Sequence, residues 1–365
     1  MMPLIRPDIS FDEVSDDIRA ILESGHLTRG PYILNFEKSL AEYVGAKFAI
    51  STTSATTALH AALVAQSIGP GDEVLVSDYT FPASGNAIVQ TGATPVLVDN
   101  MPERFDLDPS DARKKITPKT KAIMVIHPFG QPAEMAAIQS LAREHGLWVL
   151  EDAACALGAA RAGTRCGVLG DAACFSFHPR KILTTGEGGM VTTNDEALFE
   201  RLLVLLAHGG TPAEVGMRFS ENGFNYRMSE IQAALGLAQL RRFGAILSER
   251  KRIAALYIKA FENIEWASAP LSAPFEDCSF QSFVVMLKDG TNRNQIITRM
   301  HKQGIETTLG TYAMHNQPAF SRFGYTPGDL PHSNHAERLS LTLPLIKGMA
   351  EEDVARVVDA LCDSI

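Results

Sequence analysis

The 365-residue sequence lacks long apolar runs and an excess of positive charge. No apolar run reaches the length that spans a bilayer, and the N-terminal "MMPLIRPDISFDE" has no apolar core of the kind found in secretory signals. We therefore expect no membrane insertion. The formal net charge of −9 argues against general nucleic-acid binding, although it leaves room for a local basic pocket that binds an anion.

Cysteine is scarce and unpatterned. The five cysteines are odd in number and show no C-x-x-C or Cys/His spacing; they are Cys155, Cys166, Cys174, Cys278 and Cys362. A disulfide framework or a structural zinc site is therefore not expected. This usage is typical of a reduced, cytoplasmic protein, and we predict no metal site.

The common nucleotide-binding motifs are also missing. The nearest match to G-x-G-x-x-G is "GEGGMV" (186–191), which lacks the last glycine and precedes a predicted strand instead of a helix. No Walker loop is present. Neither a nicotinamide site nor a P-loop is indicated.

The sequence does contain a regular alternation of short apolar runs and helical patterns. The runs that predict buried strands are 72–77, 94–99, 121–127 and 147–152, and a helix is predicted at 132–146. This rhythm indicates a mostly parallel sheet with helices on both faces. After one long predicted helix at about 229–263 the rhythm changes, with further helices near 293–303 and 350–363. We predict a large domain at 1–244, whose first residues pack on a small domain at 245–365.

Lys181 lies in an unusual place, between the strand-like "ACFSFHP" and the small, polar "TTGEGG". A lysine just past a strand is most often a solvated loop residue. Here the glycines allow the backbone to approach a bulky ligand closely, and a lysine in a partly dry pocket can act as a nucleophile.

Three other features accompany this lysine. Asp152 ends the run "LWVL", at the carboxyl end of a strand where α/β proteins bind ligands, and could face a cationic group or cap a helix. Six hydroxyl residues within Ser51–Thr57 lie at the start of an amphipathic helix, which favours a phosphate, although capping by Ser54 or Thr53 is the simpler explanation. Phe81 could cover a flat ring or belong to the core.

A lysine amine, a carboxylate, a phosphate cradle and an aromatic plate together indicate a site for pyridoxal 5'-phosphate (PLP). In such a site the lysine forms a Schiff base with the cofactor, and an aspartate pairs with the pyridinium nitrogen. The combination is a stronger signal than any one of its members.

The sequence resembles the fold-type I, PLP-dependent sugar aminotransferases of the DegT/StrS type over nearly its whole length. The resemblance is carried by "SGHLTRGPYILNFE" (24–37), "EDAACALGA" (151–159), "FSFHPRKILTTGEGGMVTTND" (175–195) and "GFNYRMSEIQAALGLAQL" (223–240). It implies an α/β fold with a large, mostly parallel three-layer α/β/α domain and a smaller C-terminal α+β domain.

The resemblance also implies residue roles. Lys181 matches the lysine that binds PLP and moves protons, and Asp152 matches the pyridinium partner. The other implied cofactor contacts are Thr56, Thr57, Phe81, Cys155, Ser176 and, from the neighbouring subunit of a homodimer, Asn225. Cys155 stands where many members have Gln or His, and Ala55 replaces a usual glycine.

The implied reaction is the transfer of an amino group from L-glutamate or glutamine to a keto group of a nucleotide-linked deoxysugar, for a surface polysaccharide or an antibiotic. Dehydrating relatives carry His at the position of Lys181, so transamination is favoured. The candidate substrate contacts are Arg29, Arg227, Tyr312 and His315. The alternatives are a non-nucleotide keto sugar, an ulosonic acid or a cyclitol as substrate, or a PLP-binding regulator without turnover.

Overall fold

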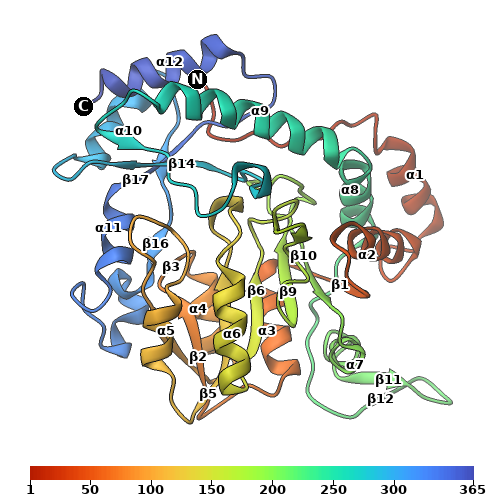
Figure 1. Ribbon diagram of the computed structural model, residues 1–365. Coiled ribbons are helices and arrows are strands. Elements are labelled where there is room, and N and C mark those ends of the chain that lie inside the picture. Colours follow the sequence, from red (N-terminus) through yellow and green to blue (C-terminus); the bar gives the residue numbers. More distant parts are fainter.

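The computed structural model describes residues 1–365 and centres on a seven-stranded sheet (Figure 1). Six strands run in one direction, and β10 alone is antiparallel to its neighbours. In spatial order the strands are β1 (Phe48–Thr52), β10 (Gly189–Thr193), β9 (Ala172–Ser176), β6 (Trp148–Asp152), β5 (Thr120–Ile126), β2 (Glu73–Ser77) and β4 (Thr94–Val98). The predicted mostly parallel α/β fold and its four predicted strands are confirmed.

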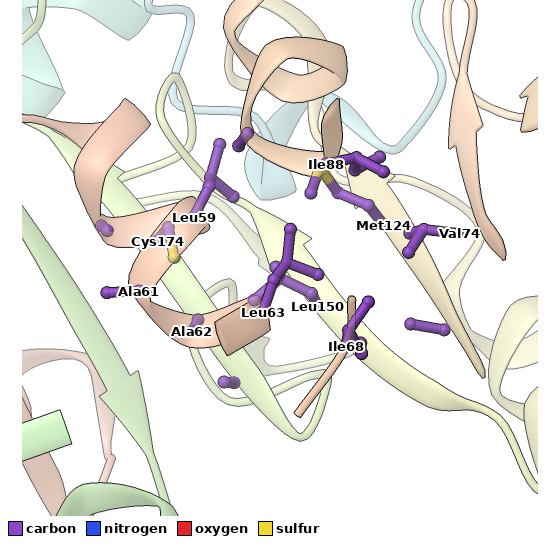
Figure 2. Close-up of a cluster of buried hydrophobic side chains, with 14 of the residues drawn as sticks. Leu59, Ala61, Ala62, Leu63, Ile68, Val74, Ile88, Met124, Leu150 and Cys174 are labelled. Atoms are coloured by element: carbon purple, nitrogen blue, oxygen red, sulfur yellow. The ribbon is translucent and has the colours of Figure 1, made fainter. Parts of the chain in front are cut away.

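Helices cover both faces of this sheet because consecutive strand residues point to opposite sides. On one face, α3 (Ala55–Ala65), α4 (Ala83–Gln90) and α7 (Glu196–Leu205) pack on side chains such as Met124 and Leu150 (Figure 2). The other face, which carries neighbours such as Val149, is covered by α2 (Pro31–Val44), α5 (Pro109–Lys115), α6 (Met135–His145) and α8 (Glu230–Arg241). α1 (Ser15–Ser24) lies outside, against α8.

A second core lies in the C-terminal part of the chain. A four-stranded sheet packs there with α9, α10 and α12 around 24 buried residues. The elements are α9 (Phe243–Phe261), β13 (Ala267–Ser268), β14 (Phe283–Leu287), α10 (Arg293–Lys302), β15 (Thr308–Leu309), β17 (Ser340–Leu343) and α12 (Glu351–Cys362).

The prediction of a single helix at about 229–263 is correct in helical content but wrong in continuity, because the structure has two helices that meet at Arg242. The guanidinium of Arg242 donates to carboxylates of Asp8 and Glu13, at 2.8 and 3.0 Å. These distant partners hold the junction, and no local pattern in the sequence reveals them.

Each part of the chain contributes a segment to the other core. Met2 forms a bridge with Ile305, and the termini lie near each other beside α12 (Figure 1). In return, β16 (Tyr312–Ala313) pairs with β3 (Tyr79–Thr80), and α11 (Pro331–Leu339) contacts both strands. The predicted boundary at 244/245 stays a prediction.

Two hairpins complete the structure. β7 (Ala160–Arg161) pairs with β8 (Thr164–Arg165), and β11 (Gly210–Pro212) pairs with β12 (Met217–Phe219). The second hairpin projects from the body of the molecule (Figure 1) and exposes Val215 and Phe219. No helix of the structure is both long and apolar enough to cross a bilayer.

Candidate active site

The candidate site lies where strands of the large sheet reach their carboxyl ends, the usual ligand edge of an α/β sheet. β6 ends at Asp152, which is in register with Cys174 of β9, so that Ser176 at the end of β9 lies on the adjacent strand. Ser176 is in turn opposite Gly189 of β10. The topology thus gathers residues that are far apart in the sequence.

Asp152 is almost fully buried, and its carboxylate accepts only two hydrogen bonds. Its Oδ1 atom accepts from the Ala154 amide at 3.1 Å, and its Oδ2 atom accepts from the Ser84 hydroxyl at 2.7 Å. No helix follows Asp152, so its local partner is a turn amide and not a helix cap. A carboxylate with this few donors retains lone pairs for a cationic partner.

The sequence pattern did not single out Ser84, which positions the Asp152 carboxylate. Ser84 lies in the first turn of α4, and its hydroxyl is 3.0 Å from that of Thr80. The one available signal was a hydroxyl at the start of a helix that follows a strand end.

Lys181 and Cys155 lie together. The Lys181 amine donates a hydrogen bond to the Cys155 sulfur at 3.0 Å. Cys155 belongs to the turn directly after Asp152, and the Lys181 amide donates to the His178 carbonyl at 2.8 Å. The side chain of Lys181 therefore points to the end of β6. It is not a loop lysine that extends into solvent.

The start of α3 lies against Gly189, the first residue of β10. Ser54 caps the helix, since its hydroxyl accepts from the Thr57 amide and its own amide donates to the Thr57 hydroxyl. The simple capping explanation is therefore correct for Ser54. The Thr56 amide, however, has no acceptor within the chain, as is usual for the first turn of a helix.

Gly189 allows β10 to pass directly under this turn. A Cβ atom at residue 189 would lie 2.4 Å from the Ser54 carbonyl carbon, so no larger residue fits. Ser176, opposite Gly189, is thereby brought to the start of α3. The result is a cradle of hydroxyl and amide donors that suits a phosphate.

Phe81 is 65% exposed, so it does not belong to the core. The ring centroid of Phe81 lies 6.3 Å from that of Tyr312. The side chain of Tyr312 is itself half-buried. An exposed aromatic face, an amine, a carboxylate with free lone pairs and a phosphate cradle form a donor set that fits PLP.

Arg29, in the loop before α2, lies near Arg227, in the segment before α8. Glu230 holds this loop, because its buried carboxylate accepts the amides of Gly30 and Tyr32, each at 2.9 Å. Burial, and then the positive charge of Arg29, lower the pKa of Arg227. The Arg227 guanidinium donates to the Leu206 carbonyl at 3.3 Å, and neither arginine forms a salt bridge with an aspartate or glutamate.

The expectation that His315 faces the cleft is wrong. Its side chain is fully buried, and its Nδ1 atom lies 2.6 Å from Oδ2 of Asp78. Asp78 follows β2 and also accepts the His315 amide at 2.8 Å, which draws the ring into the interior. Burial lowers the pKa of His315, but the hydrogen bond and charge of Asp78 outweigh it and raise the pKa overall.

Asn225 is exposed, on a segment that runs beside the phosphate cradle. The neighbouring Tyr226 carbonyl accepts the Thr53 amide at 3.0 Å. The side chain of Asn225 is therefore free to meet a partner outside its own chain.

A buried cluster of His127, Glu151 and Cys166, which no sequence spacing revealed, lies close to the site. The Glu151 carboxylate accepts from His127 Nε2 and from the amides of Gly167, Leu169 and Gly170. His127 Nδ1 accepts the Ala133 amide at 3.0 Å. Because these atoms are engaged within the chain, the cluster ties loops together and offers a metal little.

The fold and the site together define a PLP-dependent enzyme of the aminotransferase class. The chain belongs to the DegT/DnrJ/EryC1/StrS aminotransferase family, whose model matches residues 9–362.

Relatives and solved structures agree with this assignment. The chain is 43% identical to GDP-perosamine synthase of Caulobacter vibrioides, over 91% of this chain and 90% of the relative. It is 38% identical to the spore coat polysaccharide biosynthesis protein SpsC of Bacillus subtilis, over 100% of this chain and 97% of that protein. Spr1654 of Streptococcus pneumoniae, provisionally assigned as a sugar aminotransferase and solved in its PLP form, superposes with a TM-score of 0.94 at 26% identity, covering 99% of this chain and 97% of that one. The predicted family, enzyme class and cofactor are thereby confirmed.

Proposed function

We propose that this sugar aminotransferase transfers the amino group of L-glutamate to a keto group of a nucleotide-linked deoxysugar. The observation that carries the nucleotide-linked substrate is the pair Arg29 and Arg227, two neighbouring arginines that form no salt bridge. They lie on two segments that the Glu230 carboxylate connects by accepting the amides of Gly30 and Tyr32. Such a pair suits a diphosphate. A GDP-linked product in the name of one relative supports the same substrate class.

The residues of the chain have distinct proposed tasks. Lys181 attaches the cofactor, and its Nζ atom takes up and returns the proton at the α-carbon of the donor. Asp152 keeps the pyridine nitrogen protonated, and Ser84 orients the Asp152 carboxylate. PLP, when bound, supplies an electron sink for the carbanion at that carbon.

The remaining contacts follow from position. Thr56, Thr57 and Ser176 hold the phosphate, the ring of Phe81 covers the cofactor, and Cys155 lies beside Lys181. Tyr312, next to Phe81, is placed to contact the sugar. The carboxylate of the donor is the alternative partner of the two arginines.

We also propose a homodimer in which Asn225 reaches the phosphate of the neighbouring subunit. Its exposure and the apolar residues exposed nearby on the β11–β12 hairpin support a contact between copies. Mixing Lys181→Ala with Asn225→Ala tests this directly. Sharing across the dimer predicts that the mixture regains activity through one intact site per mixed dimer, whereas action within one chain predicts none.

Five free cysteines suit a reducing compartment, so we expect a cytoplasmic enzyme. The alternative substrates are keto sugars without a nucleotide, ulosonic acids and cyclitols. A regulator without turnover is the other alternative, and the presence of both Lys181 and Asp152 argues against it.

The test is a panel of keto sugars, free and linked to GDP, dTDP or UDP, each incubated with L-glutamate or L-glutamine. We expect 2-oxoglutarate and an aminated sugar with a nucleotide-linked member and glutamate. Arg29→Gln and Arg227→Gln should raise KM for that sugar at least about tenfold and leave glutamate half-reaction rates closer to normal. Equal use of free sugars, or an unchanged KM in both variants, would refute the nucleotide-linked substrate.

A further inference from the structure

The contact between Lys181 and Cys155 joins two nucleophiles, with nitrogen and sulfur 3.0 Å apart. Both side chains are half-buried, so a small oxidant can reach the sulfur. Both backbones are fixed, since the Lys181 amide donates to the His178 carbonyl and the Ala156 amide closes the turn around Cys155 by donating to Ala153 at 2.9 Å. The two reactive atoms therefore stay within reach of each other.

The other four cysteines are poorly suited to oxidation. Burial raises the pKa of the Cys278 thiol to about 12, and it also raises the pKa of the thiols of Cys166, Cys174 and Cys362. A protonated thiol reacts slowly with oxidants. None of these four sulfurs is hydrogen-bonded to a lysine. Cys155 differs from all of them in its partner.

We propose that Cys155 and Lys181 are a modification site, at which a peroxide links the two side chains by a reversible sulfur–nitrogen bond. Peroxide first oxidises the thiol to a sulfenic acid and is itself reduced to water. The unprotonated Lys181 amine then attacks the sulfur, so that an S–N bond forms, the S–O bond breaks, and the hydroxyl leaves with an amine proton as water. Two molecules of a thiol reductant restore the thiol and the amine and leave as one disulfide.

This inference rests on the proposed function in one respect, the covalent attachment of PLP to Lys181. While PLP is attached, the amine is occupied and the S–N bond cannot form. Once a donor has passed its amino group to the cofactor, the Lys181 amine is free. We therefore expect peroxide to form the S–N bond mainly in enzyme that has reacted with the donor but has no sugar acceptor.

The experiment treats the PLP-loaded enzyme with hydrogen peroxide, with and without prior L-glutamate, and maps peptides by mass. We expect a Cys155–Lys181 peptide pair, two hydrogen atoms lighter than the sum of its members, mainly after glutamate and lost on addition of dithiothreitol. The rate of inactivation should fall at least about tenfold in Cys155→Ser, relative to that variant's own starting activity. Cys362→Ser, on the exposed end of α12, should stay as sensitive as the wild type.

Two results would overturn the proposal. One is a sulfenic acid at Cys155, trapped by a 1,3-diketone, without any linked peptide after glutamate. The other is inactivation at the wild-type rate in Cys155→Ser. A linked peptide that forms equally with and without glutamate would support the S–N bond but contradict the attachment of PLP to Lys181. Failure of the S–N bond and failure of the proposed function therefore give different results.

Discussion

Glu151 and Asp152 are consecutive residues of β6, and both are buried, yet their surroundings differ. Their side chains lie on opposite faces of the sheet. Glu151 accepts four hydrogen bonds, three of them from backbone amides of the 167–170 loop. Asp152 accepts two, from Ala154 and Ser84. A carboxylate saturated by its own chain stabilises the fold, whereas one left with free lone pairs is available for chemistry.

The largest expected effect is on activity, at Asp152. Asp152→Asn should lower kcat about 10³-fold, because an amide does not keep the pyridine nitrogen protonated. The free energy of unfolding without PLP should change by less than about 1 kcal/mol, since few hydrogen bonds are lost. Steady-state kinetics and urea unfolding measure the two quantities, and Asp152→Glu is the matched control for charge. A large loss of stability with normal kcat would reverse the roles of the two carboxylates.

Glu151→Gln should show the opposite pattern. The side-chain amide of Gln has one oxygen acceptor instead of two, so some of the backbone N–H groups that donate to Glu151 would lose their acceptor. We therefore expect the free energy of unfolding to fall by about 3–5 kcal/mol. The folded fraction should still bind PLP with an unchanged absorption spectrum. Urea unfolding with and without PLP provides the measurement. A variant as stable as the wild type that fails to bind PLP would assign Glu151 to the site.

Ser84→Ala sharpens the account of Asp152. Loss of the 2.7 Å hydrogen bond to the Asp152 carboxylate should lower kcat about tenfold, since a hydrogen bond to a charged group contributes about 1.5 kcal/mol. Ser84→Thr retains the hydroxyl and should restore most of the rate. Equal kinetics in the two variants would show that Ser84 does not position the carboxylate.

The smallest expected effect concerns the ion pair of Asp78 with His315. Like Glu151, Asp78 is engaged by its own chain, so we expect this pair to stabilise the fold and not to take part in the chemistry. The pKa of His315 is raised in the folded protein, so its charged form stabilises the fold fully below the unfolded pKa of about 6.5, and this stabilisation is lost as pH rises through the folded pKa. The difference in unfolding free energy between wild type and His315→Gln should be on the order of 1 kcal/mol larger at acidic than at alkaline pH. A difference that grows with pH would contradict a charged Asp78–His315 pair.

The sequence predicted the features that depend on local pattern. The strands of the large sheet are continuous apolar runs, because both of their faces are buried, and Asp152 follows as the end of one of them. Ser176, at the end of another strand, was implied only by the family resemblance. Gly189 and the hydroxyls before α3 likewise lie within one short segment each. Such signals are readable without any tertiary information.

What the sequence did not predict depends on contacts between distant segments. The break at Arg242 is fixed by Asp8 and Glu13, and the burial of His315 is fixed by Asp78. The hydrogen bonds of Glu151 come from a loop whose path no periodicity describes. In each case a polar side chain was visible in the sequence, but its partner was not.

The most direct test of the account is to locate the cofactor lysine. The purified protein is incubated with PLP, reduced with borohydride, and mapped by peptide mass, before and after addition of L-glutamate. We expect a pyridoxyl group on Lys181 that glutamate abolishes in the wild type but that persists in Asp152→Asn. No adduct, or an adduct on another lysine, would contradict the assignment of the site.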